Sequence, residues 1–150
     1  MLVVEKAFAY ITNNDRLLVF EHVGIPEAGV QVPAGSLLPG ETAESAVVRE
    51  AVEETGLSGF SEVRFLGVSE FDVRPFGKNE MHKRHFFHLS FPGVVAERWR
   101  CFENDPSDGS RDAIQFELYW VSLSEARARL SYGHSALIEA LSACCPTAGR

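Results

Sequence analysis

Long apolar runs, a secretion signal and paired cysteines are all missing from this sequence of 150 residues. No apolar run approaches the roughly 20 residues that a membrane-spanning helix requires, so we expect no membrane association. The N-terminal stretch places Glu5 and Lys6 in a short alternating segment. It lacks the basic start and the long apolar run of a signal peptide, and we therefore expect a cytoplasmic protein.

The three cysteines, Cys101, Cys144 and Cys145, form neither an even set nor a CxxC motif. This argues against a disulfide framework and against a zinc site, and it favours a reducing compartment. The vicinal pair is a candidate redox site, but an incidental role near the end of the chain is the favoured interpretation.

Positive charge is scarce, because 14 Lys and Arg stand against 21 Asp and Glu and leave a net charge of -7. A general nucleic-acid binder neutralises backbone phosphates with its own cations, so stable nucleic-acid binding is not expected. A small phosphate-bearing ligand is still compatible, because a divalent ion can supply positive charge locally. The composition is that of a globular protein, and the length fits one domain over residues 1–150. Monomer and homodimer both stay open.

The pattern of apolar residues predicts strands and helices in an α+β order. Alternation predicts strands over residues 3–12, 16–22, 63–73, 82–91 and 114–121, with a short extended piece over 30–33. Helices are predicted over 42–55, from an N-cap at Ser124 to residue 130, and over 135–143. The turn-rich segment 104–112 is predicted to be mobile.

The helix over 42–55 has clear boundaries. Thr42 is the expected N-cap, and Gly56 supplies the left-handed residue that ends the helix. Its apolar residues form two stripes, one of Ala46, Val47 and Ala51 and another of Val48 and Val52. Apolar residues on two sides predict a helix packed between other layers.

Glu50, Glu53 and Glu54 cluster in the last turns of this helix and project within an arc of roughly 100°. That is the negative end of the helix dipole, where anions are unfavourable, and the like charges also repel one another. Taken alone, the cluster is more often a solvated acidic face paired with Arg49. A bound Mg²⁺ or Mn²⁺ removes the conflict, because these hard ions take carboxylate oxygens as ligands.

The surrounding residues decide between these alternatives. The segment GSLLPGETAESAVVREAVEETGL resembles the Nudix box, G-x5-E-x7-R-E-U-x-E-E-x-G-U, with Ala51 as a small residue at the first U position. The matching positions are Gly35, Glu41, Arg49, Glu50, Glu53, Glu54, Gly56 and Leu57. The resemblance implies a Nudix α/β/α sandwich, a mixed β-sheet with the box helix packed between layers.

The resemblance also implies roles. Glu50, Glu53 and Glu54 would bind Mg²⁺ (or Mn²⁺) together with the carbonyl of Gly35, and Glu53 or Glu54 would polarise water. Arg49, counted with them among the catalytic residues, would orient the glutamates with the support of Glu41. The implied activity is that of a Nudix-type pyrophosphohydrolase.

Outside the box the signals are weaker. Glu117 is a candidate to complete the site, with a solvent-facing strand position as the equal alternative. A basic stretch supplies candidates for substrate contact, of which we take Arg74, His82 and Arg84. Strand alternation puts His82 and Arg84 on the face opposite to Lys83, so both faces cannot line one pocket. Phe76 is a candidate for stacking on a base, although core packing is favoured.

The expected substrate is a nucleoside diphosphate derivative, with a (deoxy)nucleoside triphosphate or dinucleoside polyphosphate ranked first. ADP-ribose or a nucleotide sugar is the alternative within hydrolases. A non-catalytic nucleotide-binding sensor of the same fold and a non-hydrolytic enzyme such as an isomerase are the other classes. Because the sequence carries no clean subfamily marker beyond the box, the group attached to the diphosphate stays open.

Overall fold

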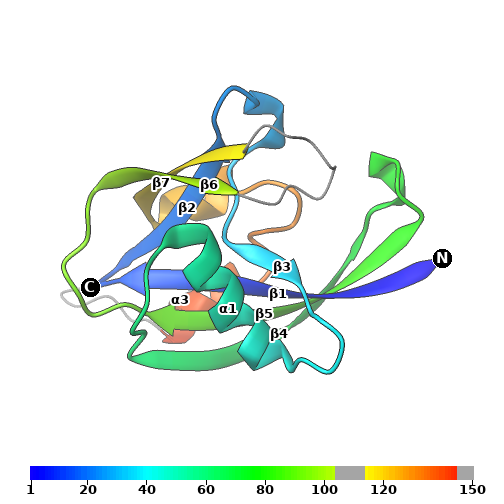
Figure 1. Cartoon of the computed structure of the whole chain (residues 1–150), viewed down its shortest axis with the longest axis horizontal. Helices are drawn as coiled ribbons and strands as arrows, with labels where there is room; N and C mark the ends of the chain where they lie inside the picture. Colours follow the sequence, from blue (N-terminus) through cyan, green and yellow to red (C-terminus); the bar gives the residue numbers. More distant parts are fainter. Residues whose placement is uncertain (104–113, 145–150) are drawn as a thin grey trace.

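The computed structural model describes residues 1–103 and 114–144, and within them the chain forms one seven-stranded mixed sheet (Figure 1). The strands are β1 (Leu2–Asn13), β2 (Arg16–His22), β3 (Ala34–Ser36), β4 (Glu62–Asp72), β5 (Glu80–Ser90), β6 (Arg98–Glu103) and β7 (Ile114–Ser122). The helices are α1 (Ala43–Thr55), α2 (Leu123–Arg129) and α3 (Ile138–Cys144), with short 3-10 turns η1 (Pro26–Ala28) and η2 (Arg74–Phe76).

The strand order is β4-β5-β1-β2-β7-β6, and β3 pairs with β1. Strands β1 and β5 are parallel along their whole length, from the pair Leu2–Glu80 to the pair Thr12–Ser90. The short β3 runs antiparallel to β1, and Lys6 lies opposite Ser36. This register places the start of the box beside the middle of the sheet.

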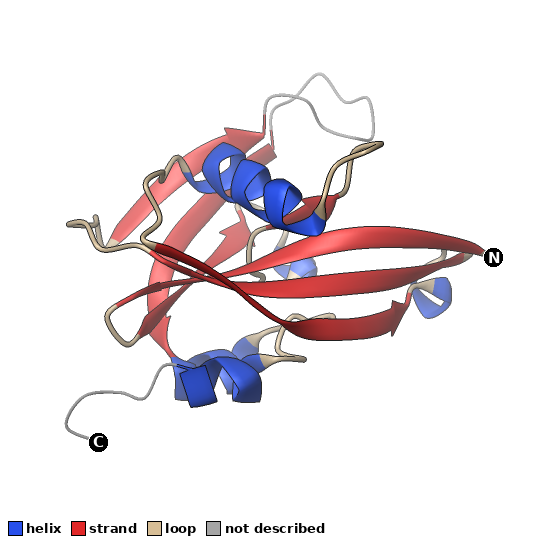
Figure 2. Ribbon diagram, turned by 90° about the horizontal axis from the view of Figure 1, so that it is seen from below, coloured by secondary structure: helices blue, strands red, loops and turns tan. Residues whose placement is uncertain are grey.

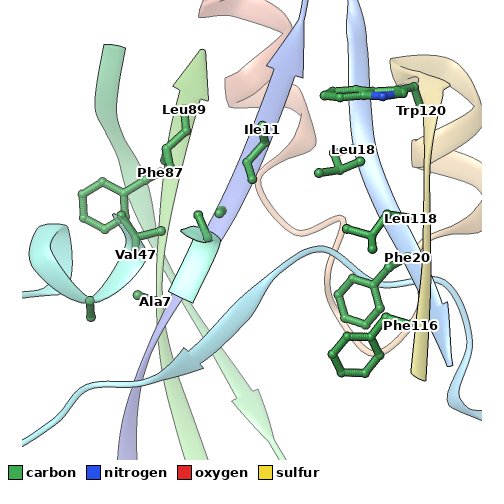
Figure 3. Close-up of a cluster of buried hydrophobic side chains, with 13 residues drawn as sticks. Ala7, Ile11, Leu18, Phe20, Val47, Phe87, Leu89, Phe116, Leu118 and Trp120 are labelled. Carbon is green, nitrogen blue, oxygen red and sulfur yellow. The ribbon is translucent and has the colours of Figure 1, made fainter. Parts of the chain in front are cut away.

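Two hydrophobic clusters hold the sheet between helices, and Figure 2 shows α1 against one face and the other two helices against the opposite face. The first cluster joins α1 to the sheet and includes Ala7, Ile11, Leu18, Phe20, Val47, Phe87, Leu89, Phe116, Leu118 and Trp120 (Figure 3). The second includes Phe8, Tyr10, Leu17, Val19, Val32, Phe86, Tyr119, Ala126, Ile138 and Leu141. Because neighbouring residues of β1 and β5 enter opposite clusters, strand alternation produces the sandwich.

The sandwich and the boundaries of α1 agree with the sequence. The Thr42 side chain accepts a hydrogen bond from the Ser45 amide at 3.1 Å, and Gly56 has a φ of 78°. Helix α1 packs against the first cluster and contacts β1, β3, β5 and β6. Its first stripe is buried, but Val52 is 38% exposed, so the second stripe lacks a complete cover.

Three predictions of individual elements differ from the structure. Helix α2 is capped by Ser122, whose side chain accepts from the Glu125 amide at 3.1 Å, so the predicted cap at Ser124 is wrong. Helix α3 begins at Ile138, after a series of turns, and not at residue 135. Strand β6 was not predicted, and its register with β7 is a tertiary feature. The predicted mobile segment 104–112 lies outside the described residues.

Cys101 forms no disulfide in the part of the chain that the structure describes, and it packs against the first cluster. Cys145 lies outside the described residues. Over residues 1–103 and 114–144, none of the helices has the length and apolar character needed to cross a membrane.

Candidate functional site

Glu50 lies directly against β3, where the backbone of Gly35 makes room for it. The Glu50 side chain is 16% exposed, and a Cβ atom at position 35 would overlap its carboxylate. Only glycine leaves this space, so the glycine that starts the box is required by a close approach of backbone and carboxylate. Figure 1 shows β3 and α1 side by side.

The other two glutamates take different positions. Glu54 accepts a hydrogen bond from the Ala34 amide at 2.9 Å, so it also faces β3. Glu53 has a side chain that is 59% exposed, and its Oε2 lies 3.4 Å from Nη1 of Arg49. Within residues 1–103 and 114–144, no three acidic, histidine or cysteine side chains converge tightly enough to hold an ion as they stand.

Arg49 forms hydrogen bonds to several parts of the box, and we call these contacts the Arg49 clamp. Its Nε and Nη2 donate to the two carboxylate oxygens of Glu41 at 2.8 and 2.9 Å, and its Nη1 donates to Glu50 at 2.7 Å. Nη2 also donates to the Ser36 carbonyl at 3.2 Å. Hydrogen bonds from Arg49 and from the Leu38 amide lower the pKa of Glu41 to about 2. The clamp thus ties the loop before α1 and strand β3 to the helix, which is the geometry of an orienting residue.

The electrostatics of Glu50 provide a test of whether a cation fits. Burial raises the pKa of Glu50, and the negative charge of Glu53 acts in the same direction, while Arg49 opposes both. Arg49 is shared among three carboxylates, so its single charge leaves this group net negative. The donors are carboxylate oxygens beside backbone carbonyls, and this chemistry fits a hard divalent ion such as Mg²⁺ or Mn²⁺.

A cavity of about 450 Å³ opens next to the box. Its lining residues are Lys6, Phe8, Ala28, Gln31, Ala34, Phe71, Val73, Phe76, His82, Arg84, Tyr132 and His134. Ala34 lines this cavity and also donates its amide hydrogen to Glu54, so the cavity and the box share a wall. Two of the candidates for substrate contact, His82 and Arg84, are therefore brought beside the box.

Arg84 has an unusual environment in this cavity. It is 5% exposed, and its guanidinium lies between the rings of Phe71 and Phe8, at 4.0 and 4.6 Å from their centroids. Its Nη1 donates to the Tyr132 carbonyl at 2.6 Å, whereas its buried Nε has no hydrogen-bond partner. Desolvation lowers the pKa of Arg84 to about 10.

Two further candidates lie elsewhere. Arg74 pairs through Nε and Nη2 with the carboxylate of Asp72 at 3.0 and 2.8 Å and does not line the cavity. Glu117 pairs with Arg98 and Arg100 at a separate depression of about 250 Å³. The structure brings neither residue to the box.

Sequence reasoning missed Lys6, Gln31, Tyr132 and His134 and gave Phe76 mainly to the core, although Phe76 is 56% exposed and lines the cavity. A signal for Lys6 existed, because it is a cation within the predicted strand over residues 3–12, on the same face as Phe8. Its neighbours, however, come from β5 and from the segment after α2, so only the assembled sheet shows the cavity.

Comparison with known proteins identifies the family and the fold. The NUDIX domain family matches residues 4–141. A NUDIX hydrolase from Nitrosomonas europaea is 26% identical with a TM-score of 0.66, covering 96% of this chain and 91% of that chain. An Ap4A hydrolase from C. elegans is 20% identical with a TM-score of 0.61 (94% and 98% covered). The NUDIX domain of Shewanella oneidensis NrtR, solved with ADP ribose, is 14% identical with a TM-score of 0.69 (96% and 89%). No curated protein matches the chain.

An α/β/α sandwich with a glutamate-rich helix beside β3 is the class of structure that the fold and the site define. The family match covers nearly the whole chain, so this chain belongs to the Nudix family and is a Nudix-type hydrolase, as its box indicated.

Proposed function

We propose that the chain is a divalent-metal-dependent hydrolase that cuts a diphosphate linkage in a nucleoside diphosphate derivative, a (deoxy)nucleoside triphosphate or a dinucleoside polyphosphate. The observation that carries this proposal is the shared wall at Ala34, which joins the complete box to a cavity large enough for part of a nucleotide. A reacting diphosphate at the box thus has space beside it for the rest of the molecule.

Each box residue has a task in this proposal. Glu50, Glu53, Glu54 and the carbonyl of Gly35 would hold Mg²⁺ or Mn²⁺, which would neutralise the diphosphate oxygens and make the attacking water more acidic. Glu53 or Glu54 then accepts the proton of that water as a general base. The high exposure of the Glu53 side chain makes it the more accessible of the two to water.

Arg49 and Glu41 act on the glutamates and not on the substrate. The two-point contact between them fixes the guanidinium plane, and the guanidinium then fixes Glu50. His82 and Arg84 would contact the substrate from the cavity. The Ap4A hydrolase and the ADP ribose-bound domain among the structural neighbours support a nucleotide as the ligand.

A substrate panel with matched variants tests the proposal. Purified protein is incubated with nucleoside triphosphates, dinucleoside polyphosphates, ADP-ribose and nucleotide sugars, in Mg²⁺, in Mn²⁺ and in EDTA, and products are separated by chromatography. We expect metal-dependent cleavage at the diphosphate, and a loss of about 100-fold or more in kcat for Glu53→Gln or Glu54→Gln.

The control variant is Glu44→Gln, which changes an exposed glutamate in the first turn of the same helix. It should keep the activity of the unchanged protein. If no panel member is cleaved in either metal, or if the two box variants are as active as Glu44→Gln, the proposed hydrolase function is wrong. Binding of a nucleotide without turnover would instead favour a sensor.

A further inference from the structure

Two cations stand side by side on the cavity wall. Lys6 on β1 and Arg84 on β5 are register partners in the parallel pair, and both line the cavity. Like charges on neighbouring positions of one sheet face repel each other, so this arrangement destabilises the folded protein. Burial is the largest cause that lowers the pKa of Lys6, followed by the positive charges of Lys78 and Arg84, while Glu80 and Glu50 oppose them.

Carboxylates do not compensate this charge within the cavity. Its described lining contains neither Asp nor Glu. Over residues 1–103 and 114–144, the Lys6 ammonium has no hydrogen bond or ion pair. Lys6 is half-buried, and the negative charges of Glu80 and Glu50 act on it only from a distance, so no direct contact neutralises its ammonium.

His134 adds a third donor. The Val32 amide donates to its Nδ1 at 3.0 Å, and burial lowers the pKa of this imidazole to about 3. The ring is therefore neutral, and its single proton sits on Nε2. The cavity lining thus combines an ammonium, a guanidinium and a neutral imidazole, which are donor groups suited to an acceptor-only group.

A purely structural role explains only part of this set. Arg84 supports the segment after α2 through the Tyr132 carbonyl, and a Cβ at Gly133 would press on Phe71 and Arg84. Tyr132 itself has a φ of 54°, a conformation that costs energy for a residue other than glycine. These contacts account for Nη1 of Arg84, but they leave Nε of Arg84 and the ammonium of Lys6 unexplained.

We propose that Lys6 and Arg84 together bind an anionic oxygen group of the substrate, a phosphate or a carboxylate, that lies beyond the diphosphate being cut. This inference rests on the proposed function and deepens it, because it selects substrates with a further negative group. Ala34 lines the cavity together with Lys6 and Arg84, and its amide contacts Glu54. The further anionic group would therefore lie next to the reacting diphosphate in the substrate. Dinucleoside polyphosphates and carboxylate-bearing nucleotide sugars have such a group.

The first experiment measures anion binding without hydrolysis. Thermal unfolding is followed in EDTA with increasing inorganic phosphate, for the unchanged protein, for Lys6→Met and for Lys83→Met. Lys83 is exposed and lies next to Arg84 in β5, but its side chain is on the opposite face of the strand. It is therefore the matched control. We expect phosphate in tenfold excess over its Kd to raise Tm by about 3 °C, except in Lys6→Met.

The same variant distinguishes a ligand-binding lysine from a structural one. Without phosphate, Lys6→Met removes the repulsion of Lys6 by Lys78 and Arg84, which outweighs its attraction to Glu80 and Glu50, and the variant should have a higher Tm than the unchanged protein. A structural lysine would show the opposite, a lower Tm. A lower Tm for Lys6→Met, or an equal stabilisation of both proteins by phosphate, would overturn the proposal.

The second experiment uses pairs of substrates that differ in one anionic group. UDP-glucuronate against UDP-glucose tests a carboxylate, and a dinucleoside tetraphosphate against the corresponding diphosphate tests a phosphate. In at least one pair, the preference in kcat/KM for the more charged member should fall about tenfold or more in Lys6→Met and persist in Lys83→Met. Unchanged preferences in both pairs would contradict the inference while leaving hydrolysis intact, whereas phosphate binding without any hydrolysis would contradict the proposed function alone.

Discussion

At several positions of the box, the residue type fits the space and the charge around it better than it fits helix formation. Gly35 has no side chain because the Glu50 carboxylate occupies that place. The three glutamates stand at the end of α1 that least favours anions, and Arg49 is shared among Glu41, Glu50 and Glu53. The proposed cation site would account for this placement of the glutamates.

Replacing Gly35 by alanine tests the close approach. The added methyl group would displace the Glu50 carboxylate, and a displacement of about 1 Å in a reacting group costs on the order of 100-fold in rate. We expect Gly35→Ala to lower kcat by about 100-fold in the substrate panel while the protein stays folded, as judged by circular dichroism.

Gly59→Ala is the comparison for that experiment. Gly59 has a φ of +79° and open space around its Cα, so alanine there strains the backbone without touching the site. It should lose about 1 kcal/mol of stability and keep its kcat. If Gly35→Ala retains full activity, or if both variants lose activity equally, the close approach is not what the box glycine provides.

At the scale of elements, N-cap residues set where α1 and α2 begin, and the Arg49 clamp sets how α1 is held against β3. Thr42 and Ser122 each receive an amide hydrogen bond in the first turn of their helices. The Arg49–Glu41 pair then ties α1 to the loop before it, which holds the glutamates in place against β3. The first feature is local, whereas the second joins segments that are brought together by folding.

The two serines at the start of α2 give a direct test of the cap. Ser122→Ala removes the acceptor for the Glu125 amide and should destabilise the protein by about 1 kcal/mol. Ser124→Ala changes an exposed serine within the helix and should stay within about 0.5 kcal/mol of the unchanged protein. Urea denaturation measures both, and equal effects would argue that α2 begins at Ser124.

At the scale of the whole molecule, the sheet is buried on both faces, and polar groups have been buried with it. His134 is 6% exposed and joins the segment after α2 to the sheet, because Val32 donates to its ring and Tyr10 donates to its carbonyl at 2.6 Å. Burial also lowers the pKa of His88, which contacts Thr12 at 2.7 Å. Neutral imidazoles are therefore part of the core.

This predicts sensitivity to acid. The pKa of His134 falls from 6.5 to about 3 on folding, so between these values the unfolded chain binds a proton that the folded protein does not. The contribution of His134 to the free energy of unfolding is fully present above pH 6.5 and declines as the pH falls toward 3. At pH 5 the loss from this one residue is about 2 kcal/mol.

Free energies of unfolding at pH 7.5, 6 and 5 measure this decline, with His134→Gln as the comparison. The glutamine variant should be less stable at pH 7.5, because the Val32 contact is altered, but its stability should depend less steeply on pH. The same slope in both proteins would show that His134 does not carry the effect.

The sequence by itself determined what depends on neighbours along the chain. The box, the caps of α1 and the alternation of β1, β2, β5 and β7 are set by spacing, by backbone preference and by burial of every second residue. The choice of Gly35, Glu41, Arg49 and Glu50 as one group follows from the 23 residues of the box, and the family resemblance implied their roles.

Only the tertiary structure decided which distant residues meet. β6 pairs with β7, and the second face of α1 stays partly exposed, because both outcomes depend on which surface covers which. The cavity is the clearest case: Lys6, Arg84 and His134 come from β1, β5 and the segment after α2. Charge repulsion and desolvation act through space, so their positions in the sequence carried no sign that they would share one wall.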